Sequence, residues 1–253
     1  MNRILNYETV KTEIVKWLGD YVLENPSIKS FVVGVSGGID SAVVSTLCAE
    51  TGLPTYVLSM PLHSSSKNDS LSDDYTDYLE KKYDNVTKIR IDLTSIYDQF
   101  IGSFDFWTGG GKFTSNNLAN ANTKSRIRMV TLYQVAGNVS GIVVGTGNKV
   151  EDYGVGFYTK YGDGGVDIAP IADLYKTEVW ELGRHFGIDE RIINAAPTDG
   201  LWDDGRTDED QLGSSYVQLE EAMEYGTGPG VKVLQKFNSQ NKHKMEPIPT
   251  FKL

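Results

Sequence analysis

A short apolar run followed at once by SGGIDS, at residues 31–41, limits what this chain can fold into more than any other segment. Phe31–Val35 predicts a buried strand, the next three residues a tight turn, and an apolar helical pattern begins at Ala42. Glycines let backbone N–H groups turn toward a common point, and a helix N-terminus adds partial positive charge there. We therefore predict a strand, turn and helix that together hold a phosphate.

The polar residues of this turn suit a nucleotide. Ser36 and Ser41 can each donate a hydroxyl, and Asp40 can hold Mg²⁺ against the phosphates. The Gly-Lys-Ser/Thr ending of the common P-loop is absent, so a different loop type is indicated. A Gly-Gly pair alone would also fit an ordinary strand–helix connection, and only the full SGGIDS motif favours the phosphate site.

Composition limits the function class. The 253 residues suffice for one domain, 1–253, and a net charge of −10 argues against nonspecific binding of nucleic acid. No apolar run is long enough for a membrane span, and the N-terminus has no signal-peptide pattern. Cys48 is the single cysteine, which excludes an internal disulfide. We expect a cytoplasmic protein that binds neither nucleic acid nor a membrane.

Strand and helix patterns alternate along the chain. Strands are predicted at 31–35, 55–60, 87–91 and 142–145, with a weaker one near 166–169. Helices are predicted near 41–51, 72–83, 94–104, 115–138, 174–186 and 208–225. Residues 141–165 are predicted to be mostly irregular. The tail from His243 is interrupted by prolines and is not expected to form a regular helix. This alternation predicts an α/β fold, a Rossmann-like doubly wound parallel sheet with helices on both faces. The loops after the strands at 31–35 and 142–145 belong on its ligand-binding edge.

SGGIDS resembles the PP-loop of the ATP pyrophosphatases, and three further stretches resemble one family among them. These are residues 122–129 (NTKSRIRM), 145–179 (with GTGN and TKYGDGG) and 197–209 (from PTDGLW to RTDE). Together they resemble the ammonia-dependent NAD synthetases, with an adenine nucleotide alpha-hydrolase-like fold. The resemblance implies a C–N ligase that uses ATP and Mg²⁺ to amidate deamido-NAD with ammonia through an NAD-adenylate, releasing AMP and pyrophosphate. It also implies a homodimer, to which helix 115–138 would contribute.

The resemblance implies a role for each matched residue. The ATP site would comprise Gly34, Val35, Ser36, Gly37, Gly38, Ile39, Asp40, Ser41, Thr146, Lys176 and Thr198. The deamido-NAD site would comprise Arg126, Lys160, Asp167, His243 and Lys244. Asp40 and Glu151 would hold Mg²⁺, Lys176 would be the cation at the phosphates, and Asp163 would receive ammonium.

Other interpretations stay open at this point. Lys160 and Lys176 could be surface lysines, and Asp163 and Asp167 could merely shape turns. Another PP-loop ligase, such as a GMP synthetase-like enzyme, would share SGGIDS but not TKYGDGG. A noncatalytic nucleotide-binding module would have little use for paired carboxylates at Asp40 and Glu151. A glutamine-using enzyme of this family would need an additional glutaminase domain with a nucleophilic cysteine, for which we expect no room.

Overall fold

The computed structural model describes residues 3, 5–63, 66–108, 111, 113–198 and 207–252. Four parallel strands form one sheet in the order β3-β2-β1-β4. They are β1 (Ser30–Gly34), β2 (Thr55–Ser59), β3 (Val86–Arg90) and β4 (Gly141–Val143). The four main predicted strands are thereby confirmed, with ends shifted by one or two residues. The weaker one near 166–169 is only a single parallel bridge between Val144 and Ile168.

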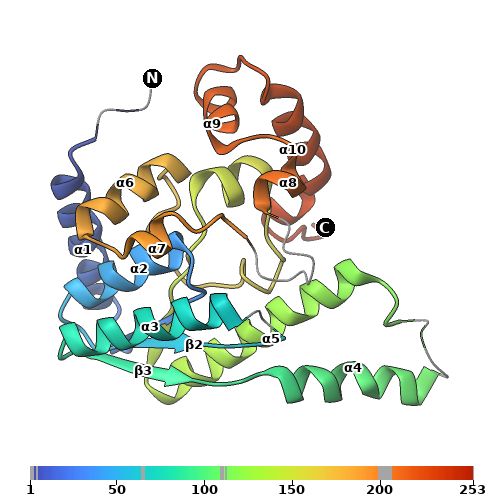
Figure 1. The fold of residues 1–253 in the computed structure, drawn as a ribbon, viewed down its shortest axis with the longest axis horizontal. Coiled ribbons are helices and arrows are strands. Elements are labelled where there is room, and N and C mark those ends of the chain that lie inside the picture. The colour runs from blue at the N-terminus through green and yellow to red at the C-terminus, as the bar shows by residue number, and fades with distance from the viewer. Residues whose placement is uncertain are drawn as a thin grey trace.

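Helices cover both faces of this sheet (Figure 1). One face packs against α1 (Tyr7–Glu24), α2 (Ile39–Glu50), α3 (Ser66–Lys82) and α6 (Lys176–Phe186), around a core that contains Phe31, Leu47 and Leu182. The other face packs against α4 (Thr94–Thr108) and α5 (Asn117–Asn138), around Val32, Leu58 and Val143. Alternate residues of β1 thus face opposite cores, as a strand buried on both sides requires. The predicted doubly wound α/β fold is confirmed.

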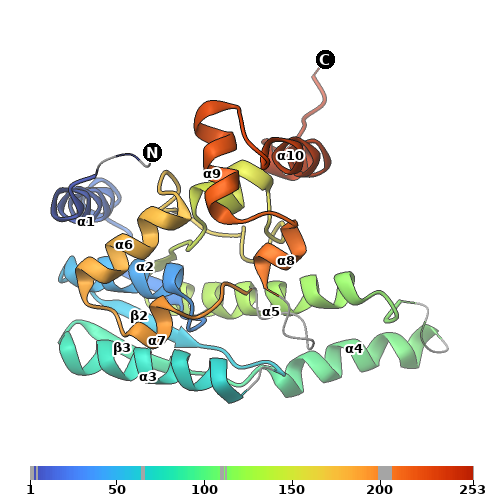
Figure 2. The same cartoon turned by 45° about the horizontal axis from the view of Figure 1, so that its top comes forward.

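The part of the chain after β4 differs most from expectation (Figure 2). It contains a π-helix, η1 (Lys149–Val155), and the helices α7 (Glu190–Ile193), α8 (Asp208–Leu212), α9 (Tyr216–Tyr225) and α10 (Val231–Met245). The expectation of irregular backbone over 141–165 was therefore wrong at η1. The single predicted helix over 208–225 is two helices, because Gly213 ends α8 in the left-handed conformation. The tail expectation was wrong only for its first three residues, because α10 includes His243 and Lys244 and ends at Met245. Residues 246–252 are not helical, as the prolines predicted.

A third, smaller apolar cluster joins these helices to the sheet. Its buried members are Val150, Val155, Tyr175, Leu212, Tyr216 and Leu219. They come from η1, the start of α6, α8 and α9, so this cluster ties the C-terminal helices to the segment that follows β4. No helix in the described part of the chain is both long and apolar enough to cross a membrane.

The sheet order places two loops at one point. The chain passes from β1 outward through β2 and β3, then returns to form β4 on the other side of β1. The carboxyl ends of β1 and β4 therefore flank the topological switch point, where open parallel sheets bind ligands. SGGIDS follows β1 and GTGN follows β4, so both predicted ligand loops lie at this edge.

Candidate active site

The loop after β1 closes on itself through hydroxyl groups. Gly37 has a φ of 86°, a left-handed conformation that glycine adopts without strain. The backbone N–H of Ser36 donates to Ser41 Oγ at 3.1 Å, and the two serine Oγ atoms lie 3.2 Å apart. Helix α2 begins at Ile39, two residues before its predicted start, so Asp40 lies in the first helical turn. Two hydroxyls and a helix N-terminus therefore meet here, as a phosphate site needs.

A lysine and two carboxylates from distant segments converge beside this loop. Lys176 Nζ donates to Asp40 Oδ2 at 2.5 Å and to Glu151 Oε1 at 2.9 Å. The lysine side chain is 3% exposed, and the two carboxylate side chains are 16% and 15% exposed. Asp40 comes from α2, Glu151 from η1 and Lys176 from the first residue of α6. The interpretation of Lys176 as a surface lysine is therefore wrong.

Charge compensation explains how these three groups tolerate burial. Burial alone would lower the pKa of Lys176, but the charges of Asp40 and Glu151 raise it above its usual value. Burial likewise disfavours ionised Glu151, yet the nearby ammonium holds its pKa below the ordinary range. For Asp40 burial outweighs the same ammonium, and together with the charge of Glu151 it raises the pKa of this carboxyl. Lys176 is therefore a buried ammonium ion between two carboxylates.

The same pair suits a divalent metal ion. Asp40 and Glu151 already converge on one cation, and hard oxygen donors are the ligands that Mg²⁺ prefers. No group of three or more His, Cys, Asp or Glu side chains able to hold a metal occurs among the described residues. A metal at this pair would therefore rely on phosphate oxygens and water for its other ligands.

Two neutral donors, which the sequence analysis did not single out as site residues, contact the carboxylates. Asn148 Nδ2 donates to Asp40 Oδ1 at 3.1 Å, and the Tyr216 hydroxyl donates to Glu151 Oε1 at 2.6 Å. Asn148 is part of the quoted GTGN motif, so its position after a strand was a usable signal. Tyr216 lies far along the chain in an ordinary helical pattern, and nothing local marks it.

The TKYGDGG segment forms a compact turn against α5. Asp163 Oδ1 accepts from Ser125 Oγ at 2.6 Å and from the Thr159 N–H at 3.0 Å. The Asp163 N–H in turn donates to Ser125 Oγ at 2.8 Å. Partial enclosure raises the pKa of Asp163, while these hydrogen bonds act in the opposite direction. Asp163 does shape its turn, and its residue is still exposed enough to meet a ligand.

Predicted substrate residues border the same turn. The Arg126 Nε and one terminal nitrogen donate to the Lys160 carbonyl, each at 3.3 Å, and Arg126 is exposed. Lys244 Nζ donates to the Tyr158 carbonyl at 2.6 Å, which joins the end of α10 to this segment. His243, one residue earlier, is exposed on α10. Arg126, Lys160 and Lys244 are therefore near one turn, as a shared site requires.

Asp167 has partners within the protein. Its Oδ2 accepts from the Val143 N–H at 2.7 Å and its Oδ1 from the Tyr133 hydroxyl at 3.0 Å. The carboxylate thus extends the pairing of β4 and joins it to α5. These contacts give Asp167 a structural part at the carboxyl end of β4.

The remaining predicted residues differ in their surroundings. Gly34 ends β1, Val35 and Ile39 are buried in the core, and Gly38 is the N-cap of α2. Thr146 follows β4 and is partly buried, and Thr198 is exposed. Residues 199–206, which carry most of the third sequence motif, lie outside the described residues.

Asp152 brings a further carboxylate to this edge. A Cβ atom on Gly147 would lie 1.8 Å from Asp152 Oδ2, so the carboxylate occupies the space where a side chain would stand. Burial, together with the charges of Asp163 and Glu151, raises the pKa of Asp152 well above its ordinary value. Glycine at 147 is therefore required by close packing and not by backbone conformation.

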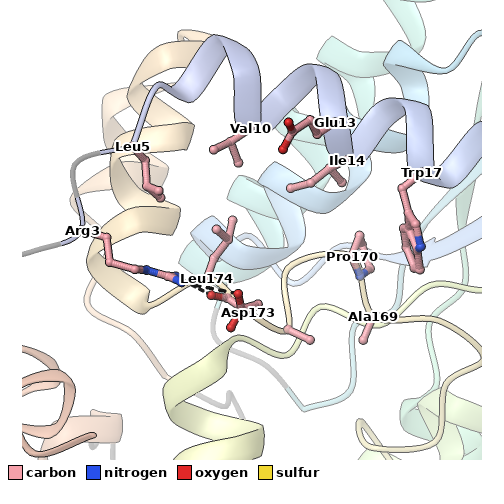
Figure 3. Close-up of a pocket in the computed structure, with 11 residues that line it drawn as sticks. Arg3, Leu5, Val10, Glu13, Ile14, Trp17, Ala169, Pro170, Asp173 and Leu174 are labelled. Carbon is pink, nitrogen blue, oxygen red and sulfur yellow. Dashed lines mark hydrogen bonds and ion pairs between the residues drawn. The ribbon is translucent and has the colours of Figure 1, made fainter. Parts of the chain in front are cut away.

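A cavity of about 400 Å³ lies elsewhere, between α1 and the segment 169–174 (Figure 3). Apolar side chains such as Val10, Ile14 and Leu174 line it, and Arg3 pairs with Asp173 at its edge. None of the predicted site residues lines this cavity. The cavity is therefore separate from the residues predicted to bind the substrates.

Comparison with known proteins identifies the family of this chain. The NAD synthase family model matches residues 10–248. The NH(3)-dependent NAD(+) synthetase of Carboxydothermus hydrogenoformans is 37% identical over 252 residues, covering 97% of this chain and 98% of that relative. The enzyme of the same name from Finegoldia magna is 34% identical, covering 98% and 97%.

A solved structure of NMN synthetase from Francisella tularensis superposes with a TM-score of 0.86 at 31% identity, covering 99% of this chain and all of that one. The NH3-dependent NAD synthetase from Campylobacter jejuni gives a TM-score of 0.75 at 24% identity, covering 98% of this chain and 100% of that one, and supports the fold alone. The motifs, the α/β fold and these matches over nearly the whole length agree: the chain belongs to the NAD synthase family.

Proposed function

We propose that this protein makes NAD by joining ammonia to the nicotinate carboxylate of deamido-NAD at the expense of ATP. The observation that carries the proposal is the convergence of Lys176, Asp40 and Glu151 beside the SGGIDS loop at the switch point of the sheet. The oxygen of a carboxylate is a poor leaving group, so amide formation requires that the carboxylate first be activated. Transfer of AMP from ATP gives an acyl adenylate and pyrophosphate, and ammonia then displaces AMP.

Electrostatics is the central difficulty of the first step, because a carboxylate must approach a phosphate of like charge. Asp40 and Glu151 would hold Mg²⁺, which when bound supplies positive charge to the triphosphate. Lys176 would add a cation at the phosphates, and Ser36 and Ser41 would supply hydroxyl donors for the pyrophosphate oxygens. Because Lys176 contacts both carboxylates in this structure, binding of Mg²⁺ there would require its ammonium to turn from them toward the phosphates.

The second step needs ammonia near the activated carbonyl. Asp163 is oriented by Ser125 and Thr159, which leaves its carboxylate able to hold an ammonium ion and take part in its deprotonation. Arg126 and Lys160 border the same turn and would bind the anionic dinucleotide. Asp167, His243 and Lys244 complete the proposed dinucleotide site, with Thr146 and Thr198 on the ATP side.

A direct assay tests this proposal. The protein is supplied with ATP, Mg²⁺, ammonium and deamido-NAD, and NAD and AMP are measured as products. Conversion of xanthosine monophosphate instead would favour a GMP synthetase-like enzyme. Absence of pyrophosphate release with any of these acids would favour a noncatalytic nucleotide-binding module.

A mononucleotide acid is the second candidate substrate, favoured by the likeness to the NMN synthetase structure. NMN lacks the adenylate half of NAD, and its acid precursor presents the same nicotinate carboxylate to the same chemistry. The ratio of kcat/KM for deamido-NAD and for nicotinate mononucleotide decides between them. A ratio well above one supports NAD synthesis, and a ratio well below one supports NMN synthesis.

We also propose a homodimer and a cytoplasmic location. Helices α4 and α5 extend beyond the sheet in both views (Figures 1 and 2) and carry several large apolar side chains that are exposed. These are Ile96, Phe100, Phe104, Phe106, Trp107, Leu118 and Val130. Exposed apolar side chains gathered on two helices mark an interaction surface, and a second copy would cover them symmetrically. The free, buried thiol of Cys48 suits a reducing compartment.

A further inference from the structure

Two neutral hydrogen-bond donors stand behind the charged groups of the site, one for each carboxylate. Asn148 donates to Asp40 Oδ1, while Lys176 takes the other oxygen, Oδ2. The Tyr216 hydroxyl donates to Glu151 Oε1, which also accepts from Lys176. Asn148 is 0% exposed and Tyr216 1% exposed, so neither reaches a substrate through solvent. The Asn148 amide nitrogen is directed at Asp40, and the shorter hydrogen bond of the Tyr216 hydroxyl is the one to Glu151, since Asp208 Oδ2 lies 3.3 Å away.

Each donor is itself held in one orientation. Asn148 is the N-cap of η1, and its Oδ1 accepts from the N–H groups of Val150 and Glu151 at 3.0 and 3.1 Å. Rotation of this amide would break those bonds, so its Nδ2 stays directed at Asp40. The Tyr216 ring packs in the third apolar cluster, edge-on to Trp180 with 5.9 Å between centroids. Both donors are therefore rigid supports.

Their neutrality matters because the carboxylates must change partners. At present Lys176 compensates both negative charges. A divalent metal at the same pair takes over that role, and two cations on one carboxylate repel each other. Uncharged donors do not compete with a metal, so they can hold the carboxylates whichever cation is present. Such outer hydrogen bonds orient ligating carboxylates and strengthen metal binding.

We propose that Asn148 and Tyr216 are positioning residues, which keep Asp40 and Glu151 placed for a divalent metal when Lys176 no longer neutralises them. This inference rests on the proposed function only in taking the two carboxylates as the Mg²⁺ ligands. The proposal also gives helix α9 a role at the site, because Tyr216 belongs to α9 and its hydroxyl donates to Glu151.

The test separates metal binding from folding and from turnover. The Kd of ATP is measured by calorimetry in excess Mg²⁺ and again in EDTA, and the ratio gives the gain in ATP affinity due to Mg²⁺. Tyr216→Phe removes one hydroxyl and leaves the ring in place. We expect the gain due to Mg²⁺ to fall on the order of tenfold, with the Kd in EDTA unchanged. A purely structural role would weaken ATP binding equally in both conditions.

Tyr175→Phe is the matched control. Tyr175 belongs to the same apolar cluster, is 5% exposed, and its hydroxyl donates to a carboxylate outside the site, Glu224, at 2.8 Å. We expect this variant to keep the full gain due to Mg²⁺. Equal gains in the two tyrosine variants, or the absence of any gain in the unaltered protein, would overturn the proposal.

A second variant decides the matter if Tyr216→Phe does not fold. Asn148→Ser keeps an oxygen that can cap η1 but loses the donor to Asp40. Asn116→Ser is its control, since Asn116 caps α5 at 3.0 Å without contacting a site carboxylate. A loss of the gain in Asn148→Ser alone supports the proposal, and an unchanged gain refutes it. A protein that shows these effects but makes no NAD would contradict the proposed function and leave this inference standing.

Discussion

Lys176 and Asp40 are 136 residues apart in the chain, yet Nζ and Oδ2 lie 2.5 Å from each other. Each belongs to the first turn of a helix, α6 for the lysine and α2 for the aspartate. The two helices pack side by side on one face of the sheet, and this packing brings their N-termini together. The SGGIDS motif thus places the carboxylate, and the packing of α6 on α2 brings the lysine to it.

Removal of the lysine should make stability depend on Mg²⁺. In Lys176→Met, Asp40 and Glu151 remain buried without their ammonium partner, which costs about 3–5 kcal/mol. For a chain of this size that corresponds to a fall in Tm of roughly 10 °C. Mg²⁺ bound at the pair restores compensation, so millimolar Mg²⁺ should raise the Tm of the variant much more than that of the unaltered protein. Thermal unfolding with and without Mg²⁺ measures this.

Lys149→Met is the control for this prediction. Lys149 Nζ pairs with Asp173 at 2.8 Å, but that carboxylate is 82% exposed and well solvated. An exposed ion pair contributes little, so its loss should lower Tm slightly and leave no special response to Mg²⁺. If both variants responded to Mg²⁺ alike, the carboxylate pair would not be the metal site.

Arg126→Ala should affect the dinucleotide much more than ATP. The guanidinium is exposed, and its hydrogen bonds within the described residues are two long ones to the Lys160 carbonyl, so it can also bind a phosphate or carboxylate. We expect the KM for deamido-NAD to rise at least tenfold while the KM for ATP changes little. Arg184→Ala, on the exposed side of α6, should change neither. Equal effects of Arg126→Ala on both KM values would show that Arg126 does not belong to the dinucleotide site.

Asp163→Asn should separate the two half-reactions. The asparagine oxygen can still accept from Ser125 and Thr159, so the turn should persist, but the negative charge for ammonium is lost. We expect the KM for ammonium to rise at least tenfold. Exchange of pyrophosphate into ATP, which reports adenylate formation, should continue at nearly its normal rate. Loss of that exchange would show that Asp163 acts before ammonia enters.

The rate of NAD formation should depend on pH as expected for ammonia as the nitrogen donor. NH₃ is the nucleophile, and NH₄⁺ dominates at neutral pH, so the available NH₃ rises roughly tenfold for each pH unit from about 7 to about 8.5 and then levels off. At limiting total ammonium, the rate should rise with pH over that range. Glutamine supporting the same rate as ammonium, in a preparation free of glutaminase, would contradict this prediction.

Much of the fold was predictable because its signals are local. The apolar residues of β1 and the glycines after it predict a buried strand and a turn. The predicted strands agree closely with β1 to β4. The placement of SGGIDS and GTGN at one edge also followed, since parallel strands share a direction and the sheet order reverses between β1 and β4.

The missed features depend on contacts between distant residues. Tyr216 contacts Glu151 across 65 positions, and a helical pattern cannot show which carboxylate a buried hydroxyl will meet. Helix α10 packs on η1 with apolar side chains that are only partly buried, so its apolar face is a weak signal for a helix in the sequence. The final turn of that helix also contains His243 and Lys244, which the prolines farther along had suggested were irregular.

The exposed apolar surface of α4 should be an interface between two copies of the chain. Trp107 is 81% exposed and Phe106 79% exposed, and their rings contact each other edge-on with 5.2 Å between centroids. Leaving two large rings in water is unfavourable, and a two-fold partner would bury them on both copies. We expect a dimer by light scattering. Trp107→Lys places a charge in this interface and should yield a monomer.

Leu23→Lys provides the control for that substitution. Leu23 is 79% exposed as well, but it lies on α1, at the opposite end of the molecule from α4 (Figure 1). This variant should remain a dimer with normal activity. If the interface also supports the dinucleotide site, Trp107→Lys should lose activity, and dilution of the unaltered protein should reduce specific activity as dimers dissociate. If the unaltered protein is monomeric at working concentration and fully active, both the interface and its proposed support of the dinucleotide site are refuted.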